Sequence, residues 1–263
     1  MFQEERMTLI LEHLNKHKRI NVEDICKLFS VSRDTARRDL VNLEKQGSIL
    51  RTHGGAILPP EQKVITNYND RLKYEYETKR HIGKLAATLI KNEDTIIMDT
   101  STTVQASAEF ISVNHCTVIT NSINVADILT NKQGVDIHLL GGQLNHEHRF
   151  LYGGAALSML SNYFADKVFL GALGLTAQGV TVSHPEDAEV MRKMIEQSKE
   201  VIILADHSKF GNNAVYKVAE LEDVDIIITD QLPPKPLLNI LNEKNINLII
   251  VNYDGGFYET DSY

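Results

Sequence analysis

The stretch from Ser32 to Leu43 carries side chains that could contact a DNA groove. Its apolar residues Ala36, Leu40 and Leu43 fall on one face of a predicted helix, so that face must pack against the rest of its domain. The polar side chains beside or opposite that face are Ser32, Arg33, Thr35, Arg37 and Arg38. Guanidinium groups bind phosphate oxygens and guanine edges, although a cationic helix face is also typical of an ordinary solvated surface.

The residues before this helix favour the DNA-binding interpretation. Residues 7–14 and 22–29 each carry apolar residues at helical spacing, which predicts two amphipathic helices. Asn21 can cap the second of them, and Ser32 can cap the cationic helix. Only two residues separate these last two helices, a spacing that predicts a helix-turn-helix. We expect the cationic helix to end at Gly47.

A hairpin is predicted directly after this helix. Ile49–Arg51 and Ala56–Leu58 are short apolar runs that flank the turn-rich residues 52–55. We expect this hairpin to form a wing whose Arg51 and His53 contact backbone phosphate or the minor groove. On the helix, Asp34 and Asp39 are expected to orient the arginines, and Arg37 and Arg38 to contact phosphates or guanine edges.

This part of the chain resembles the DNA-binding domain of the DeoR family of bacterial transcriptional regulators. The resemblance covers about residues 5–58 and is carried by Arg37-Arg38-Asp39-Leu40, Gly47 and above all Arg51-Thr52-His53-Gly54-Gly55-Ala56. One departure is Ala36, where the family more often has a bulkier β-branched residue. The resemblance implies a winged helix-turn-helix that binds double-stranded operator DNA.

The composition is that of an ordinary globular protein. Of the 263 residues, 43% are hydrophobic and 24% charged, with a net charge of −8. Residues 1–58 hold 10 Lys and Arg against 8 Asp and Glu, whereas residues 59–263 hold 17 against 27. The first part is therefore only mildly basic, so individually placed arginines must attract the phosphates. Without a run of about 18 apolar residues or a signal peptide, we expect a cytoplasmic protein with no membrane partner.

No residue pattern predicts a cofactor or a metal. Cys26 and Cys116 lie within apolar patterns and read as buried thiols. His146, Glu147 and His148 could ligate a metal, but no second cluster has the spacing that would complete three or four ligands.

Two prolines, Pro59 and Pro60, predict a linker, because proline cannot continue a sheet or a helix. We therefore assign residues 1–58 to a winged helix-turn-helix domain, 59–74 to a linker, 75–252 to an effector and oligomerisation domain, and 253–263 to a mobile tail. A single helix is predicted from about Asn69 to Lys91.

Short apolar runs alternate with helical stretches through the larger domain. The runs are Thr95–Met98, Thr117–Thr120, Ile137–Leu140, Val168–Leu170, Val201–Leu204, Ile226–Thr229 and Leu248–Val251. The helical stretches lie at about 103–112, 122–131, 155–165, 187–198 and 236–244. Near-continuous Val, Ile and Leu suits strands buried on both faces, so we expect a Rossmann-like, mostly parallel α/β sheet.

Polar or glycine-rich residues follow several of these runs. In such a sheet, ligands bind at the carboxyl ends of the strands. The residues expected to gather there are Asp99, Ser101, Thr102, Thr103, Asn121, Gly141, Gly142 and Lys209. Hydroxyl groups and backbone N–H groups at the start of a helix suit an anion, although the same residues also form ordinary helix caps.

This domain also resembles the effector domain of the DeoR family, a relative of the fold shared by ribose-5-phosphate isomerase and glucosamine-6-phosphate deaminase. The resemblance covers roughly residues 75–232. It implies that a phosphorylated sugar or related metabolite binds at the hydroxyl loop and Lys209, with Asp187 nearby. Ser101 stands where the family usually has glycine, Asp187 where it more often has glutamate, and Met191 where it more often has lysine.

The sequence therefore predicts a transcriptional repressor of a carbohydrate operon, controlled by a phosphorylated sugar. A homo-oligomer, either a dimer or a tetramer, would let paired DNA-binding domains bind repeated half-sites of the operator. The alternatives are a sugar-phosphate isomerase with an accessory DNA-binding domain and a pure interaction scaffold. The loop from Gly171 to Thr176, where the isomerases carry acids, contains none. We therefore expect no catalytic residues.

Overall fold

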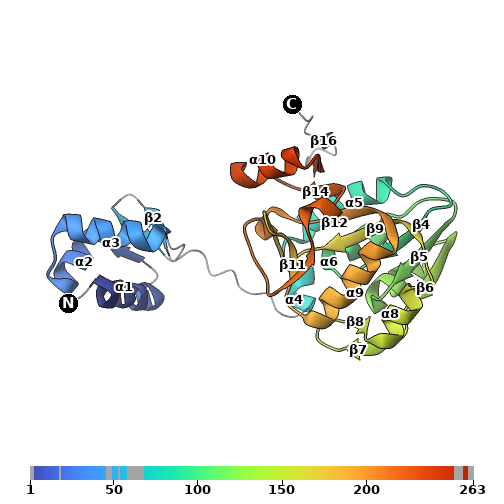
Figure 1. Cartoon of the computed structure of the whole chain (residues 1–263), viewed down its shortest axis with the longest axis horizontal. Helices are drawn as coiled ribbons and strands as arrows, with labels where there is room; N and C mark the ends of the chain where they lie inside the picture. Colours follow the sequence, from blue (N-terminus) through green and yellow to red (C-terminus); the bar gives the residue numbers. More distant parts are fainter. Residues whose placement is uncertain are drawn as a thin grey trace. The chain divides into compact units, whose positions relative to one another are not determined.

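The computed structural model describes residues 3–17, 19–45, 49–52, 54–57, 68–251 and 257–259. It forms two compact units, Met1–Thr66 and Asn67–Tyr263 (Figure 1). We call these the head and the sensor unit and describe each by itself.

The head is a three-helix domain with a small sheet. Its elements are α1 (Gln3–His17), β1 (Arg19–Asn21), α2 (Val22–Phe29), α3 (Arg33–Lys45), β2 (Leu50–Thr52) and β3 (Gly55–Ile57). The strands form an antiparallel sheet in the order β1-β3-β2. The predicted helix-turn-helix and wing are confirmed, and β1 is an additional strand that the sequence analysis did not predict.

Local capping explains where the head's helices begin. Asn21 accepts from the backbone N–H of Asp24, whose side chain accepts from the N–H of Asn21 in return, so both ends of this capping box are present. Ser32 Oγ accepts from the backbone N–H of Thr35 at 3.2 Å and so caps α3. Ser30 ends α2 in the left-handed conformation. The predicted stop at Gly47 lies outside the described residues.

A buried ion pair fastens α1 to α3. Asp39 is completely buried on α3 and accepts from Arg6 Nε at 2.6 Å and Arg6 Nη2 at 3.1 Å. Gln3 donates to the same carboxylate at 3.1 Å. The hydrogen bond that Arg6 donates to Asp39 raises the pKa of the Arg6 guanidinium. The prediction that Asp39 orients the DNA-facing arginines is therefore wrong, because it lies on the core face of α3.

The sensor unit is built on one eight-stranded sheet in the order β16-β15-β14-β12-β9-β4-β5-β6. The strands are β4 (Thr95–Met98), β5 (Cys116–Thr120), β6 (Val135–Leu139), β9 (Ala165–Gly171), β12 (Ser198–Leu204), β14 (Ile226–Thr229), β15 (Asn247–Val251) and β16 (Phe257–Glu259). All pairings are parallel except that of β15 with β16. Every predicted strand is present, and the mostly parallel α/β fold is confirmed.

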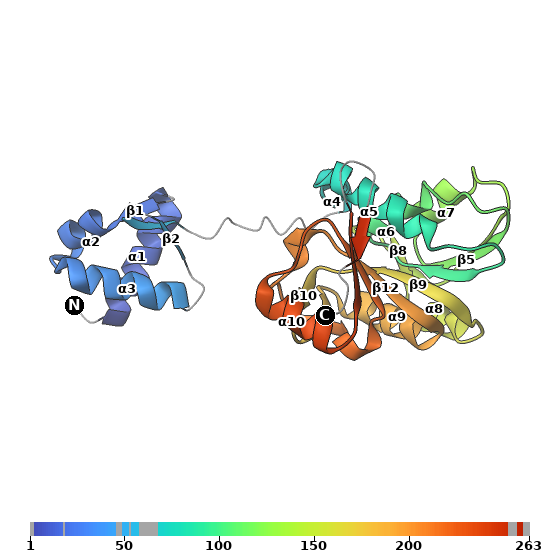
Figure 2. The same cartoon turned by 90° about the horizontal axis from the view of Figure 1, so that it is seen from above.

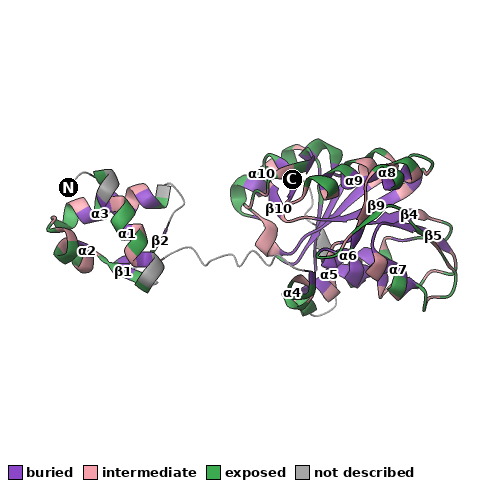
Figure 3. Cartoon of the chain, turned by 90° about the horizontal axis from the view of Figure 1, so that it is seen from below, coloured by how far each residue is buried: buried purple, intermediate pink, exposed green. Residues whose placement is uncertain are grey.

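Helices cover both faces of this sheet (Figure 2). One layer contains α5 (Tyr76–Thr88), α6 (Thr102–Ala108) and α7 (Ile123–Leu129), and the other contains α8 (Gly154–Leu160), α9 (Pro185–Glu196) and α10 (Lys235–Glu243). Alternate residues of each strand enter the two cores: Ile97 packs with the α8 layer, whereas Ile96 packs with the α5 layer. Figure 3 shows the resulting continuous buried band along the strands.

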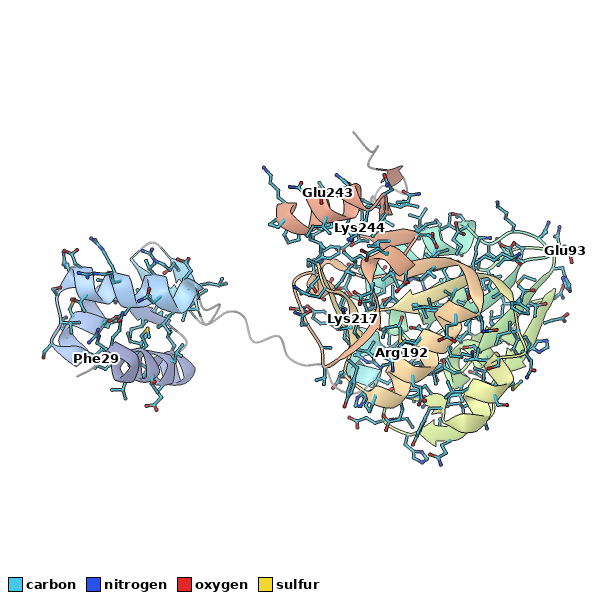
Figure 4. The ribbon with its side chains drawn as sticks, viewed as in Figure 1. Phe29, Glu93, Arg192, Lys217, Glu243 and Lys244 are labelled. Carbon is cyan, nitrogen blue, oxygen red and sulfur yellow. The ribbon has the colours of Figure 1, made fainter. Side chains whose placement is uncertain are left out.

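Small antiparallel elements complete the sensor unit. A hairpin pairs β7 (Gln143–Asn145) with β8 (Phe150–Tyr152), and a three-stranded sheet contains β10 (Gly174–Thr176), β11 (Gly179–Val182) and β13 (Tyr216–Ala219). Arg192 of α9 donates to the backbone carbonyl of Lys217 on β13 at 2.6 Å, which ties this sheet to α9; both residues are labelled in Figure 4. None of the helices in the described ranges is long and apolar enough to cross a membrane.

Three predicted boundaries differ from the structure. The segment assigned to the linker, 59–74, contains helix α4 (Tyr68–Lys73), whose Tyr68 is buried in the sensor unit. The single helix predicted from Asn69 to Lys91 is two helices, because Glu75 adopts the left-handed conformation between α4 and α5. Within the predicted mobile tail, Phe257–Glu259 pairs with β15 and closes one edge of the sheet.

The ion pair between Arg6 and Asp39 predicts a large stability change. We expect Asp39→Ala to lower the free energy of unfolding of the head by about 3 kcal/mol, because it leaves a buried guanidinium without its carboxylate. Native-state hydrogen exchange of α1 and α3, read by mass spectrometry, measures this change. Arg33→Ala is the control, since it breaks an exposed pair with Glu23 that contributes less than about 1 kcal/mol. Equal effects of the two substitutions would contradict the assignment.

Candidate functional site

The outer face of α3 presents the predicted DNA-contacting side chains. Arg37 and Arg38 are exposed and have no ion pair among the described residues. Arg33 Nη2 lies 2.7 Å from Glu23 Oε1 of α2, so this arginine is partly neutralised. The hydroxyl groups of Ser32 and Thr35 lie 2.9 Å apart at the start of the helix.

The wing contributes one further exposed cation, Arg51 on β2. His53, the other predicted wing contact, lies outside the described residues. The described side chains of α3 and of the wing therefore offer three cations without an ion partner to a DNA backbone: Arg37, Arg38 and Arg51.

In the sensor unit, the carboxyl ends of β4 and β9 form the second candidate site. From β4 the chain runs outward to β5 and β6, and then returns to the other side of β4 as β9. This reversal is a topological switch point, the place where open α/β sheets bind ligands. Asp99, directly after β4, is almost fully buried and accepts from the backbone N–H groups of Ser101 at 2.7 Å and Gly171 at 2.8 Å.

Glycine is required opposite Asp99. A Cβ atom on Gly171 would lie 2.2 Å from the Cβ of Ser101, so only glycine lets β9 approach the loop after β4 this closely. Ser101 Oγ accepts from the backbone N–H of Val104 at 3.0 Å and thereby caps α6. Thr102 and Thr103 are buried in the first turn of that helix. The predicted hydroxyl loop is thus present at the switch point.

Asp187, on α9, belongs to the same site. Burial, together with the negative charge of Asp99, raises the pKa of Asp187 to about 7, whereas Arg71 opposes this shift. Burial likewise raises the pKa of Asp99 to about 6, although its two backbone donors oppose the rise. The Oδ1 atom of Asp187 is buried and has no hydrogen bond, so this carboxyl group is ready to accept one from a ligand.

Arg71 is a site residue that the sequence analysis missed. It lies on α4, and its guanidinium interacts electrostatically with Asp187 and Asp99 and stacks on the ring of Tyr68, with Cζ 5.7 Å from the ring centroid. Burial lowers the pKa of Arg71, against the opposing effect of the two carboxylates. Its Nε atom is buried without a hydrogen-bond partner. Because the segment was assigned to the linker, a cation there gave no signal of a binding role.

The loop after β12 contributes a second set of charged side chains to this edge of the sheet. Asp206 is completely buried, and Lys209 Nζ lies 3.5 Å from its Oδ2 atom. Burial alone would raise the pKa of Asp206, but Lys209, Ser208 and Lys79 outweigh it, so this pKa lies below its ordinary value. Lys79 of α5 donates to the backbone carbonyl of Tyr74 at 2.8 Å and to that of Arg71. Burial lowers the pKa of Lys79 to about 8.

We call Arg71, Lys79, Asp99, Asp187, Asp206 and Lys209 the charged edge cluster. Three cations face three carboxyl groups in it, but Asp99 and Asp187 have pKa values of about 6 and about 7. Burial thus favours the neutral form of both carboxyl groups, so they neutralise the three cations less completely, which suits an anion. Its buried atoms without hydrogen bonds, Arg71 Nε, Asp187 Oδ1 and Asp206 Oδ2, suit a ligand that also bears hydroxyl groups.

Not every predicted residue joins this cluster. Asn121, after β5, is completely buried; its Nδ2 donates to the carbonyl of Leu151 at 3.3 Å, and its Oδ1 has no hydrogen bond. Gly141 and Gly142 are exposed, and Gly142 is needed because a Cβ there would lie 2.4 Å from the carbonyl oxygen of Tyr152. These two glycines shape the start of the β7–β8 hairpin.

His148, in the turn of the neighbouring β7–β8 hairpin, lies beside Arg71 and next to His184, which precedes α9. The rings of His148 and His184 lie 4.3 Å apart, and burial, helped by the charge of Arg71, lowers the pKa of His148. Among the described residues, no three His, Cys, Asp or Glu side chains converge as a metal site requires. The other face of α4 borders an open hollow of about 190 Å³, which contains none of the predicted residues and is lined by Tyr68, Asn69, Leu72, Gln105, Asn124, Asp127, Ile128 and Arg149.

Comparisons with known proteins cover both units. The family described as "DeoR-like helix-turn-helix domain" matches residues 6–62, and the one described as "DeoR C terminal sensor domain" matches residues 74–231. The chain is 51% identical to the HTH-type transcriptional repressor GlcR of Bacillus subtilis (strain 168) over 256 residues, 97% of this chain and 99% of that protein.

The chain is also similar to a second transcriptional repressor and to one solved structure. The Glycerol-3-phosphate regulon repressor of Escherichia coli (strain K12) is 35% identical over 251 residues, 94% of this chain and 99% of that protein. A solved D-ribose-5-phosphate isomerase in complex with phospho-erythronic acid aligns with 51% of this chain and 54% of its own, at 12% identity and a TM-score of 0.39.

The raised pKa values of Asp99 and Asp187 predict how stability depends on pH. The folded sensor unit keeps protons on these carboxyls that the unfolded chain releases, so its free energy of unfolding falls as pH rises from about 4 to about 7. Asp187→Asn should therefore raise the melting temperature more at about pH 8 than at about pH 5. Glu189→Gln, an exposed acid on the same helix, is the control. Thermal unfolding followed by circular dichroism measures both, and an equal gain from Asp187→Asn at both pH values would contradict the assignment.

Proposed function

Because this chain belongs to the DeoR family and is a DNA-binding transcriptional regulator rather than an enzyme, we propose that it represses a carbohydrate operon and that a phosphorylated sugar bound at the charged edge cluster controls it. The observation that carries the effector proposal is the set of one buried and two half-buried cations, Lys79, Arg71 and Lys209, together with buried polar atoms that lack hydrogen bonds, near the topological switch point. A phosphate group would interact with the cations, and sugar hydroxyls would donate to the buried carboxyl oxygens.

On the DNA side, α3 would lie in the major groove. The first turn carries Arg33 and Thr35, which would contact base edges, whereas Arg37 and Arg38 would contact phosphates or guanine edges. The hydroxyl of Ser32 would contact the backbone at the helix start, and Arg51 and His53 on the wing would contact phosphate or the minor groove.

On the effector side, Lys209 and Arg71 would bind the phosphate. The hydroxyl loop of Ser101, Thr102 and Thr103, beside Asp99, would line the same pocket, while Asp187 would accept from sugar hydroxyls. Asn121, with its unpaired Oδ1, is a further acceptor, and Gly141 with Gly142 would shape the rim. The names of the two relatives, which mention a repressor and the glycerol-3-phosphate regulon, are consistent with this class of ligand.

The head is only mildly basic, so one copy would bind DNA weakly. A homo-oligomer in the cytoplasm, with paired heads on repeated half-sites, would raise the affinity through effective concentration. We place the coupling between ligand and DNA in α4, because this helix follows residues 59–67 in the chain and supplies Arg71 to the cluster. A tenfold loss of operator affinity requires about 1.4 kcal/mol of coupling free energy.

If α3 is the helix that contacts DNA, removing Arg37 and Arg38, which have no ion pair among the described residues, should weaken operator binding. We expect Arg37→Ala with Arg38→Ala to abolish specific operator binding and to lower the salt dependence of the remaining binding by roughly two counterions. Fluorescence anisotropy at several salt concentrations measures both quantities. Lys27→Ala, which removes an exposed cation from α2, is the control and should cost far less. Operator affinity that survives the double substitution would refute this recognition face.

The effector proposal predicts a specific role for Arg71. We expect at least one compound from a panel of sugar phosphates to raise the melting temperature of the wild-type protein. Arg71→Ala should lower the affinity of the protein for that compound by about tenfold or more, because a charge-assisted contact to phosphate is lost. The matched control is Lys73→Ala, an exposed cation on the same helix. Equal affinity of the two variants for the compound would exclude Arg71 from the site.

A further inference from the structure

Among the residues that the structure describes, no strand pairs with the outer edge of β6. The sheet ends at this strand, whereas the opposite edge is closed by the antiparallel strand β16 (Figure 1). Asp136, His138 and Leu139 of β6 are exposed, and Leu139 retains 40% of its accessible surface. A five-residue edge strand with an exposed leucine is a template for pairing with another strand.

The hydrogen-bond pattern shows which backbone groups are available. The N–H of Leu140 donates to the carbonyl of Thr120, and the carbonyl of Gly134 accepts from the N–H of Cys116, so the even-numbered residues face β5. Because backbone direction alternates along a parallel strand, the N–H and C=O groups of Val135, Ile137 and Leu139 face away from the sheet. These three residues supply a regular ladder of donors and acceptors.

We propose that β6 pairs antiparallel with β6 of a second copy of this chain, across a two-fold axis at Ile137, so that the two sheets continue as one. In this register Ile137 lies opposite Ile137 of the second copy, and Val135 lies opposite its Leu139. The outward-facing groups then exchange hydrogen bonds in matched pairs. An isologous contact of this kind closes as a dimer.

Charge selects this register over its neighbours. With the axis at Ile137, each Asp136 lies opposite His138 of the other copy, in the closely spaced pair that has no hydrogen bonds between backbones. Moving the axis to Asp136 would set two carboxylates against each other, and moving it to His138 would set two imidazoles together. The sequence Val-Asp-Ile-His-Leu is therefore complementary to itself in one register.

Both side chains have a neighbour in their own chain and remain exposed enough to make these contacts. His138 Nδ1 lies 2.9 Å from the hydroxyl of Tyr163. When Nδ1 accepts from that hydroxyl, Nε2 carries the proton and can donate to a carboxylate. Asp136 lies 3.3 Å from His115 Nε2 on the surface, and its side chain remains 68% exposed. On the opposite side of the strand, Val135 and Ile137 join the core beneath the α5 layer, so pairing would extend that core across the axis.

The test is the mass of the full-length protein in solution, without DNA or effector, measured by sedimentation velocity. Asp136→Lys sets lysine against histidine, and His138→Asp sets two carboxylates together, so each variant alone should weaken the dimer on the order of tenfold. Mixing the two variants should restore a heterodimer, because lysine then lies opposite aspartate in one pair and histidine opposite aspartate in the other. The exchange of the two residues in one chain, Asp136→His with His138→Asp, should also keep the wild-type mass.

The control is Asp127→Lys, which makes the same charge change on an exposed position of α7 and should leave the mass unchanged. Circular dichroism verifies that each variant is folded. A monomeric wild type, single variants that keep the wild-type mass, or a mixture that stays dissociated would each overturn the proposal. Operator binding and effector binding are not part of this readout, so the pairing of β6 is tested separately from the DNA-binding and effector-binding parts of the proposed function.

Discussion

Carboxyl groups buried at one edge of the sensor sheet must be matched by positive charge. Asp99 and Asp206 are buried almost completely, and a buried carboxylate without a cation costs several kcal/mol. The strands that supply these acids carry no cation at their carboxyl ends except Lys209 in the loop after β12. The remaining positive charge comes from Arg71 on α4 and Lys79 on α5. Electrostatics therefore holds α4 and α5 to the edge where a ligand would bind.

This arrangement makes α4 both a part of the candidate effector site and the first described element after residues 59–67. A ligand can shift an equilibrium only by as much as its affinity differs between two states. An anion at the charged edge cluster would compete with Asp187 and Asp99 for Arg71, so it would change the interactions that hold α4. In the head, a buried carboxylate is also paired with a cation: the ion pair between Arg6 and Asp39 fixes α1 against α3. Arg37 and Arg38, on the other face of α3, remain exposed to solvent.

The seven short apolar runs could be predicted as strands because a strand buried on both faces leaves a continuous run of Val, Ile and Leu. The caps at Asn21 and Ser32 could be predicted because their chemistry is local. The short strands β7, β10 and β13 left no such run, and the break at Glu75 depends on a left-handed backbone that glutamate seldom adopts. Asp39 was misassigned and Arg71 was missed for one reason: each is defined by a partner more than 25 residues away, which spacing along the chain does not reveal.

The measurement that tests the central claim most directly is operator binding by the wild-type protein, followed by fluorescence anisotropy at fixed salt during titration with a panel of sugar phosphates. The account predicts that at least one phosphorylated compound changes operator affinity severalfold, while its dephosphorylated form has no effect. It also predicts that this response disappears in Arg71→Ala although operator binding is retained. A compound that binds the sensor unit tightly and leaves operator affinity unchanged would contradict the account.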